Sequence, residues 1–72
     1  MNYVEITLLG GDHLCIRKDA IMVVREFKSI PKELVKEKPF LKGCSGCTVI
    51  VLADRQEIYC KDPYSSIIEM LK

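Results

Sequence analysis

The clearest pattern in this sequence is a pair of matching segments, Ile6-Thr7-Leu8-Leu9-Gly10-Gly11-Asp12-His13-Leu14-Cys15-Ile16 and Ile50-Val51-Leu52-Ala53-Asp54-Arg55-Gln56-Glu57-Ile58-Tyr59-Cys60. In each, residues that alternate with period two flank a short polar stretch, as expected for a strand, a turn and a second strand. In the alignment apolar residues coincide as the pairs Ile6/Ile50, Leu8/Leu52, Leu14/Ile58 and Ile16/Cys60. The sequence therefore predicts two hairpins of similar design.

The two turns differ in their residues. Gly10-Gly11 predicts a two-residue turn, because glycine adopts positive φ without a Cβ clash. Asp54-Arg55 lacks a glycine, which favours a longer loop in the second hairpin. On the strands, alternation assigns these residues to the core face: Val4, Ile6, Leu8, Leu14, Ile16, Ile50, Leu52, Ile58 and Cys60. Tyr59 is expected to face outward.

Val49 and Val51 are apolar although they lie on the expected outer face. Two explanations remain open at this stage. Either this strand is central and covered on both faces, or these two valines form a surface for self-association.

Two further elements complete the expected fold. Ile21–Phe27 is rich in β-forming residues and predicts a third strand. After Asp62, a candidate cap, and Pro63, apolar residues at helical spacing predict a C-terminal helix of about nine residues. The predicted fold class is therefore mainly β, over a single domain of residues 1–72. It is a four- to five-stranded antiparallel, bent or barrel-like sheet built from two hairpins and capped by one helix.

Residues 28–47 form a long segment between the third strand and the second hairpin, expected to be a functional loop or a mobile arm. Pro31 precedes residues 32–38, which could form one or two helical turns. Lysines outnumber glutamates in residues 28–42 by five to two. The candidate nucleic-acid contacts are Lys32, Lys36, Lys38 and Lys42. The alternative is a lysine-rich loop that is simply solvated.

Composition and charge exclude several classes of protein. The 72 residues are 49% hydrophobic and 29% charged, which is typical of a globular chain rather than a disordered one. The net charge of +1 provides no overall field toward nucleic acid or membrane. Apolar runs such as residues 49–53 are far shorter than the ~20 residues of a membrane span. Residues 1–5 lack a basic region, so we expect no signal peptide and a cytoplasmic location.

Cys44-Ser45-Gly46-Cys47 is the one recognisable chemical motif. Two thiolates at this spacing can bind one Zn²⁺, and His13 and Cys15 are the candidates for the remaining ligands. A redox role is the second interpretation, although the strand that follows offers no helix N-terminus to lower a thiol pKa. The third is a pair of ordinary thiols, with zinc absent. We expect no enzyme, because no nucleophile can be placed near His13, and the adjacent Asp12 is expected to point to the opposite face of the strand.

The order of elements resembles a small bacterial family. A hairpin, a third strand, Thr48-Val49-Ile50-Val51-Leu52, a polar turn, Glu57-Ile58-Tyr59-Cys60-Lys61 and a helix after Asp62-Pro63 are similar to the FlbD-like proteins of flagellar and swarming operons. The resemblance covers residues 3–27 and 48–71, while residues 28–47 replace a short turn of the family. It implies the fold and a bacterial or phage-like setting, and it carries no catalytic motif.

These observations favour a non-enzymatic interaction or regulatory module that associates with a protein partner or with a second copy of itself. Exposed strand edges would permit association by strand addition. The alternatives are a nucleic-acid-associated regulator that uses residues 28–42, and a small zinc-binding module that uses Cys44 and Cys47. No membrane contact is expected.

Overall fold

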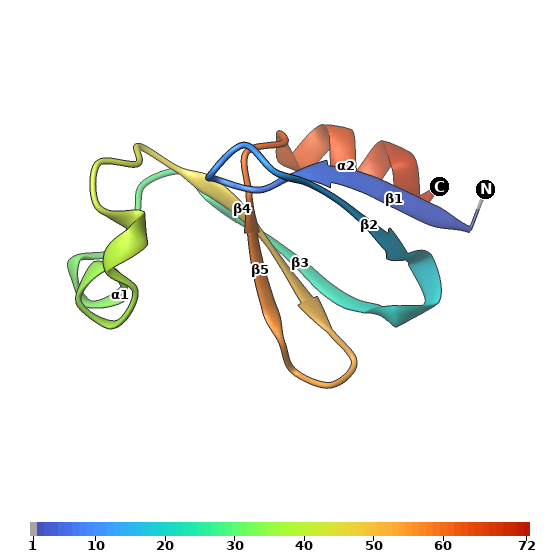
Figure 1. The fold of residues 1–72 in the computed structure, drawn as a ribbon, viewed down its shortest axis with the longest axis horizontal. Coiled ribbons are helices and arrows are strands. Elements are labelled where there is room, and N and C mark those ends of the chain that lie inside the picture. The colour runs from blue at the N-terminus through green and yellow to red at the C-terminus, as the bar shows by residue number, and fades with distance from the viewer. Residues whose placement is uncertain (1) are drawn as a thin grey trace.

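A computed structural model describes residues 2–72 and shows a mainly β protein with a C-terminal helix, which confirms the predicted fold class (Figure 1). The strands are β1 (Tyr3–Thr7), β2 (His13–Arg17), β3 (Ile21–Phe27), β4 (Cys47–Leu52) and β5 (Glu57–Cys60). The helices are η1 (Lys18–Ala20), α1 (Lys32–Glu37), η2 (Pro39–Leu41) and α2 (Tyr64–Leu71). None of these helices is long and apolar enough to cross a membrane, as judged over residues 2–72.

The strands form two antiparallel sheets, β1-β2 and β3-β4-β5, rather than one continuous sheet. A single bridge between Leu8 and Cys60 links them. Next to it, the Lys61 N–H donates to the Thr7 carbonyl at 2.8 Å. Beyond this corner the β1-β2 hairpin does not pair with β5 within residues 2–72. The described strands therefore form two sheets joined at one corner and do not close into a barrel.

The turn of the first hairpin is one residue longer than the glycine pair suggests. The Leu8 N–H donates to the Asp12 carbonyl at 2.7 Å, and the Gly11 N–H donates to the Leu8 carbonyl at 2.9 Å. Only Gly11 has positive φ, at 99°. This is a three-residue loop that ends in a left-handed residue, so the predicted two-residue turn is wrong.

The second hairpin repeats this turn bond for bond. The Leu52 N–H donates to the Gln56 carbonyl at 2.9 Å, and the Arg55 N–H donates to the Leu52 carbonyl at 2.9 Å. Arg55 takes the left-handed position with φ of 72°. This loop is longer than a two-residue turn, as predicted, but the expected difference in length between the two hairpins is wrong, while the predicted repeat of hairpin design is confirmed.

The main core lies between the two sheets and α2. Its buried residues are Val4, Ile6, Ile16, Ile50, Cys60 and Ile67. The predicted core faces are thus confirmed for most positions. Leu14 is the exception, with 37% of its surface exposed, because β2 is an edge strand that pairs only with β1 among the described strands.

A second apolar cluster covers the opposite face of β4. Its buried residues are Leu41, Cys47, Val49 and Tyr59, and half-buried side chains from residues 28–41 pack around them. The segment 28–46, called the arm below, contains α1 and η2 and projects at one end of β3 and β4 (Figure 1), where its apolar side chains pack on this cluster. Strand β4 is central, and its second face is covered at Val49, as in the first of the two explanations, while Val51 is half-buried. Tyr59 points outward from the main core as predicted, but the arm buries it.

Asp62 joins three elements instead of capping the last helix. Its Oδ1 accepts a hydrogen bond from the Thr7 N–H at 2.6 Å, and its carbonyl accepts one from the buried Thr48 Oγ1 at 2.7 Å. Pro63 is the N-cap residue of α2, and no side chain caps the helix. The predicted capping role of Asp62 is wrong because its carboxylate is taken by the end of β1.

Candidate functional site

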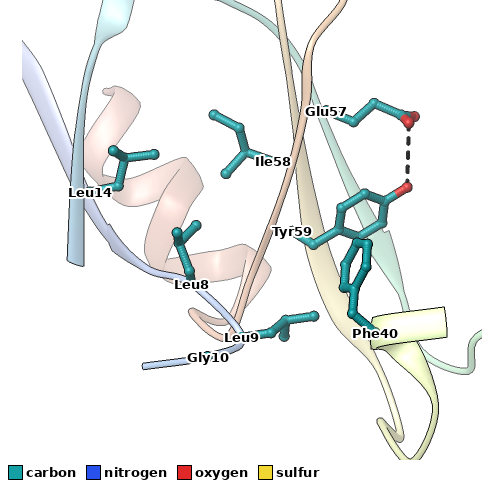
Figure 2. A pocket seen from close by; sticks show the side chains of 8 residues that line it. All are labelled: Leu8, Leu9, Gly10, Leu14, Phe40, Glu57, Ile58 and Tyr59. Atoms are coloured by element: carbon teal, nitrogen blue, oxygen red, sulfur yellow. Dashed lines mark hydrogen bonds between the residues drawn. The ribbon is translucent and has the colours of Figure 1, made fainter. Parts of the chain in front are cut away.

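An apolar groove of about 350 Å³ lies at the corner where the two sheets diverge (Figure 2). Its lining comes from the β1–β2 loop, β2, β5 and the arm: Leu8, Leu9, Gly10, Leu14, Phe40, Glu57, Ile58 and Tyr59. The volume is near the lower end of the range of ~300–1,000 Å³ typical of ligand sites. It has room for one or two side chains rather than for a large cofactor.

The groove extends over both sides of β5. Figure 2 shows Leu8, Leu14 and Ile58 on one side of this strand, and Leu9, Phe40 and Tyr59 on the other. This division follows from the pleat, since successive residues of a strand point to opposite faces. The groove therefore offers two adjacent compartments that are separated by the backbone of β5.

Phe40 and Tyr59 form the aromatic compartment. Their rings make an edge-to-face contact with centroids 5.5 Å apart. Tyr59 is 7% exposed whereas Phe40 is 59% exposed, so the Phe40 ring remains open to solvent at the groove. Such a pair adds roughly 0.5–1.5 kcal/mol beyond the area that it buries, which helps to hold Phe40 in place beside β5.

Two charged residues border the aromatic compartment. Lys38 Nζ lies 3.7 Å from Glu57 Oε1 and 5.6 Å from the centre of the Tyr59 ring. The Tyr59 hydroxyl lies 3.5 Å from Glu57 Oε1. Burial, followed by the negative charge of Glu57, raises the pKa of Tyr59 to about 12. Tyr59 is therefore neutral near pH 7 and acts as a hydrogen-bond donor to this carboxylate.

The edge of β5 that faces the groove is mostly unpaired. Strand β5 has a full ladder with β4 on one side and only the Leu8–Cys60 bridge on the other, as far as residues 2–72 show. Because alternate backbone amides of a strand point to the same edge, the Glu57 N–H is directed to the side from which Lys61 donates to Thr7. An open strand edge thus lies along an apolar groove.

The thiols of the Cys44–Cys47 motif lie at the junction of the arm and β4. Cys47 is buried in the second apolar cluster, and Cys44 is half-buried. Burial, and then the nearby Cys44 thiol, raises the pKa of Cys47. Both causes disfavour the thiolate that zinc binding or thiol–disulfide exchange requires.

Gly46 has a packing role in this motif. A Cβ atom at this position would stand 2.6 Å from the Phe27 carbonyl oxygen. The absent side chain therefore lets the end of the arm pass the end of β3, a close approach that the sequence pattern does not reveal.

The remaining predicted metal ligands, His13 and Cys15, are exposed on β2. His13 Nδ1 lies 3.3 Å from Thr7 Oγ1, and Cys15 is paired across the hairpin with Glu5. Within residues 2–72, no three His, Cys, Asp or Glu side chains come together in a group that could hold a metal ion. The structure therefore does not gather His13, Cys15, Cys44 and Cys47 into one site.

The candidate nucleic-acid residues divide into two sets. Lys32, Lys36 and Lys42 are exposed on the arm, while Lys38 is partly buried beside Glu57. Of the candidate self-association residues, Val49 is 1% exposed beneath the arm and Val51 is half-buried. Val49 is thus not available at the surface of the folded chain.

Sequence reasoning did not single out the groove. Its residues appeared as core positions (Leu8, Leu14, Ile58), as an outward tyrosine and as part of a loop. The one sequence signal was Leu9, which adds a second apolar residue next to Leu8 just before the glycines. Pairing Leu9 with Phe40 requires knowledge of how the arm folds back.

No protein-family model, curated protein or solved structure matches this chain. The resemblance to FlbD-like proteins therefore stays a prediction from the order of elements.

Proposed function

We propose that this protein is a non-enzymatic interaction module that binds a partner protein through the groove between the β1–β2 hairpin and β5. The observation that carries the proposal is the combination of an apolar groove with an exposed anchor residue. Phe40 and Leu14 are large apolar side chains that remain 59% and 37% exposed although a packed cluster lies beside each. Exposed apolar groups around a concave site are typical of binding surfaces.

Three buried ionisable groups are unsuited to nucleophilic or basic chemistry near pH 7. Burial raises the pKa of Cys47 and raises the pKa of Cys60 to about 11, and it raises that of Tyr59 to about 12. A thiol or phenol that acts as a nucleophile or base near pH 7 needs the opposite shift. These groups serve packing and hydrogen bonding.

The proposal is tested by selecting peptides from a random library displayed on phage, with the wild-type protein as bait. Selected peptides are then titrated into ¹⁵N-labelled protein. We expect the largest amide shifts at Leu9, Leu14, Ile58 and Tyr59, and a loss of binding in Phe40→Ser. Met22→Ser is the matched control, because Met22 is 57% exposed on β3 outside the groove lining. Failure to select any peptide, or shifts confined to another surface, would contradict the proposal.

A further inference from the structure

We infer that the partner presents a short extended segment in which a large aliphatic or aromatic residue is adjacent to a lysine or arginine, and that this segment lies along the open edge of β5. The inference rests on the proposed function and specifies the chemistry of the partner. It follows from four features of the groove: its open strand edge, its two compartments, its one carboxylate and its limited area.

The open strand edge favours an extended partner. The amide of Glu57 is directed toward the groove, and no strand of residues 2–72 pairs with β5 there beyond the Leu8–Cys60 bridge. A peptide that adds to a sheet edge gains main-chain hydrogen bonds, which a helix cannot supply. The wall of the groove that is formed by β5 is thus a template for one more strand.

The two compartments set the order of side chains in such a segment. Consecutive residues of an extended chain point to opposite faces. One residue would therefore enter the aliphatic compartment of Leu8, Leu14 and Ile58, and its neighbour would face Phe40 and Tyr59. The volume of about 350 Å³ accommodates one large anchor and part of the next side chain.

Charge determines which neighbour fits. Of the described residues that line the groove, only Glu57 is charged. Lys38 already shows that the aromatic compartment attracts an ammonium group, because its Nζ lies 3.7 Å from Glu57 and 5.6 Å from the Tyr59 ring centre. The open Phe40 ring offers a second aromatic face to a cation. Glu57 is 41% exposed and can share its carboxylate between Lys38 and a second cation, so a lysine or arginine complements this compartment. An acidic residue would find only Lys38, which Glu57 already pairs.

The limited apolar area argues against a second copy of the chain as the occupant. A stable dimer of standard size buries about 800 Å² on each partner, which is a large share of the 5160 Å² surface of residues 2–72. The other exposed large apolar residues lie outside the groove lining: Tyr3, Met22, Val23 and Tyr64. The groove by itself is suited to a short segment.

The test uses three synthetic eight-residue peptides with blocked ends. The first carries a central leucine flanked by lysines in a valine- and threonine-rich strand sequence. The second replaces the lysines by glutamates, and the third keeps the lysines but has N-methylated backbone amides at alternate positions. Each is titrated into the full chain and followed by amide shifts and by the exchange rate of the Glu57 amide.

We expect the lysine peptide to bind at the groove and to slow exchange of the Glu57 amide. The glutamate peptide should bind about two- to fivefold more weakly, since it loses the contact with Glu57 and meets a lysine that is already paired. The N-methylated peptide should also bind more weakly, because it cannot complete the strand pairing. Equal affinity for the lysine and glutamate peptides, or unchanged exchange of Glu57, would overturn the inference.

Variants separate the charge effect from a change in folding. Glu57→Gln should reduce the preference for lysine over glutamate by about threefold, and Glu57→Lys should reverse it. Glu5→Gln is the matched control, an exposed carboxylate on β1 outside the groove lining. Lys38→Gln should increase the affinity for the lysine peptide, because it removes the internal cation that competes for Glu57. An unchanged preference in Glu57→Lys would contradict the assigned role of this carboxylate.

The failure of this inference is distinguishable from that of the proposed function. If library-selected peptides of other chemistry bind the groove while the lysine peptide does not, the groove is a binding site but its ligand is not basic and apolar. If no peptide binds and native mass spectrometry shows a dimer that Phe40→Ser dissociates, the occupant is a second copy. If no peptide binds and the protein is a monomer, both proposals fail.

Discussion

Arg55 shows how one residue can be strained by a turn that the chain uses twice. It occupies the position that Gly11 takes in the first hairpin, with φ of 72° against 99° for the glycine. The hydrogen bonds of the two turns are the same, so the backbone conformation is imposed by the turn and not by the residue. A left-handed conformation costs a residue with a Cβ about 1–2 kcal/mol.

We expect Arg55→Gly to raise the free energy of unfolding by roughly 0.5–1 kcal/mol, because relief of the strain exceeds the extra chain entropy of glycine in the unfolded state. The reciprocal change, Gly11→Ala, should lower it by about 1 kcal/mol. Urea unfolding followed by circular dichroism measures both. A destabilised Arg55→Gly variant would show that the arginine side chain makes a stabilising contact that outweighs its strain.

Gly46 is needed for close packing rather than for an unusual φ. A methyl group there would contact the Phe27 backbone oxygen at 2.6 Å, and backbone atoms in a strand have little room to move. We expect Gly46→Ala to lower the free energy of unfolding by about 1–3 kcal/mol. Gly10→Ala is the matched control, since nothing lies within 4 Å of its Cβ position, and it should change stability by less than about 0.5 kcal/mol. Equal urea midpoints for the two variants would contradict this explanation.

At the scale of elements, the arm is the part of the chain whose role changes most between sequence and structure. Its sequence is basic and interrupted by prolines, which is typical of a solvated loop. In the structure Leu41 is fully buried against Val49 and Tyr59, and half-buried Leu34 and Val35 support it. The arm therefore completes the core on one face of β4 and at the same time places Phe40 at the groove.

We expect Leu41→Ala to lower the free energy of unfolding by about 2–4 kcal/mol, as for other fully buried leucines. Leu34 on α1 is only half-buried, so Leu34→Ala should lower the free energy of unfolding by clearly less. Because Leu41 adjoins Phe40, the first variant should also weaken peptide binding at the groove, whereas the second should not. Urea unfolding and the peptide titration described above measure the two effects. A small and equal loss of stability for both variants would mean that the arm contributes little to the fold.

At the scale of the whole molecule, two apolar clusters share β4 and β5, and both clusters bury groups that can ionise. Cys60 lies in the first, where burial and then the charge of Asp62 raise its pKa from 9.0 to about 11. Tyr59 lies in the second, with a pKa raised from 10.0 to about 12. In both cases the folded protein holds a proton that the unfolded chain releases at lower pH.

The titration of these two groups should therefore leave stability almost unchanged below about pH 9, and stability should fall as the pH rises through 9–12. In that window the unfolded chain binds fewer protons than the folded protein, so each group contributes a slope of up to about 1.4 kcal/mol per pH unit. Urea unfolding at pH 8, 9, 10 and 11 measures the decline. Cys60→Ala should be less stable at pH 8 but should lose less stability between pH 9 and 11. A wild-type slope that the variant reproduces unchanged would exclude Cys60 as a source of the decline.

The sequence by itself determined the local pattern of this protein. Alternation of apolar and polar residues identified both hairpins, and helical spacing at Ile67, Ile68 and Leu71 identified α2. The repeat between the hairpins was also readable, because the residues of a strand face are fixed by a period of two whatever the strand packs against.

Only the tertiary structure decided what covers each face, how the turns close and where a site forms. The coverage of Val49, the exposure of Leu14 and the pairing of Phe40 with Tyr59 all depend on contacts between segments far apart in the chain. Asp62 also depends on a contact between distant segments, since its carboxylate accepts a hydrogen bond from the end of β1 instead of capping the helix that follows it. Local patterns predict which side chains share a face of a strand. The way in which the arm packs against β4 and β5 decides which distant side chains are in contact. For this reason the groove at β5 is a property of the folded chain, although every residue in it is visible in the sequence.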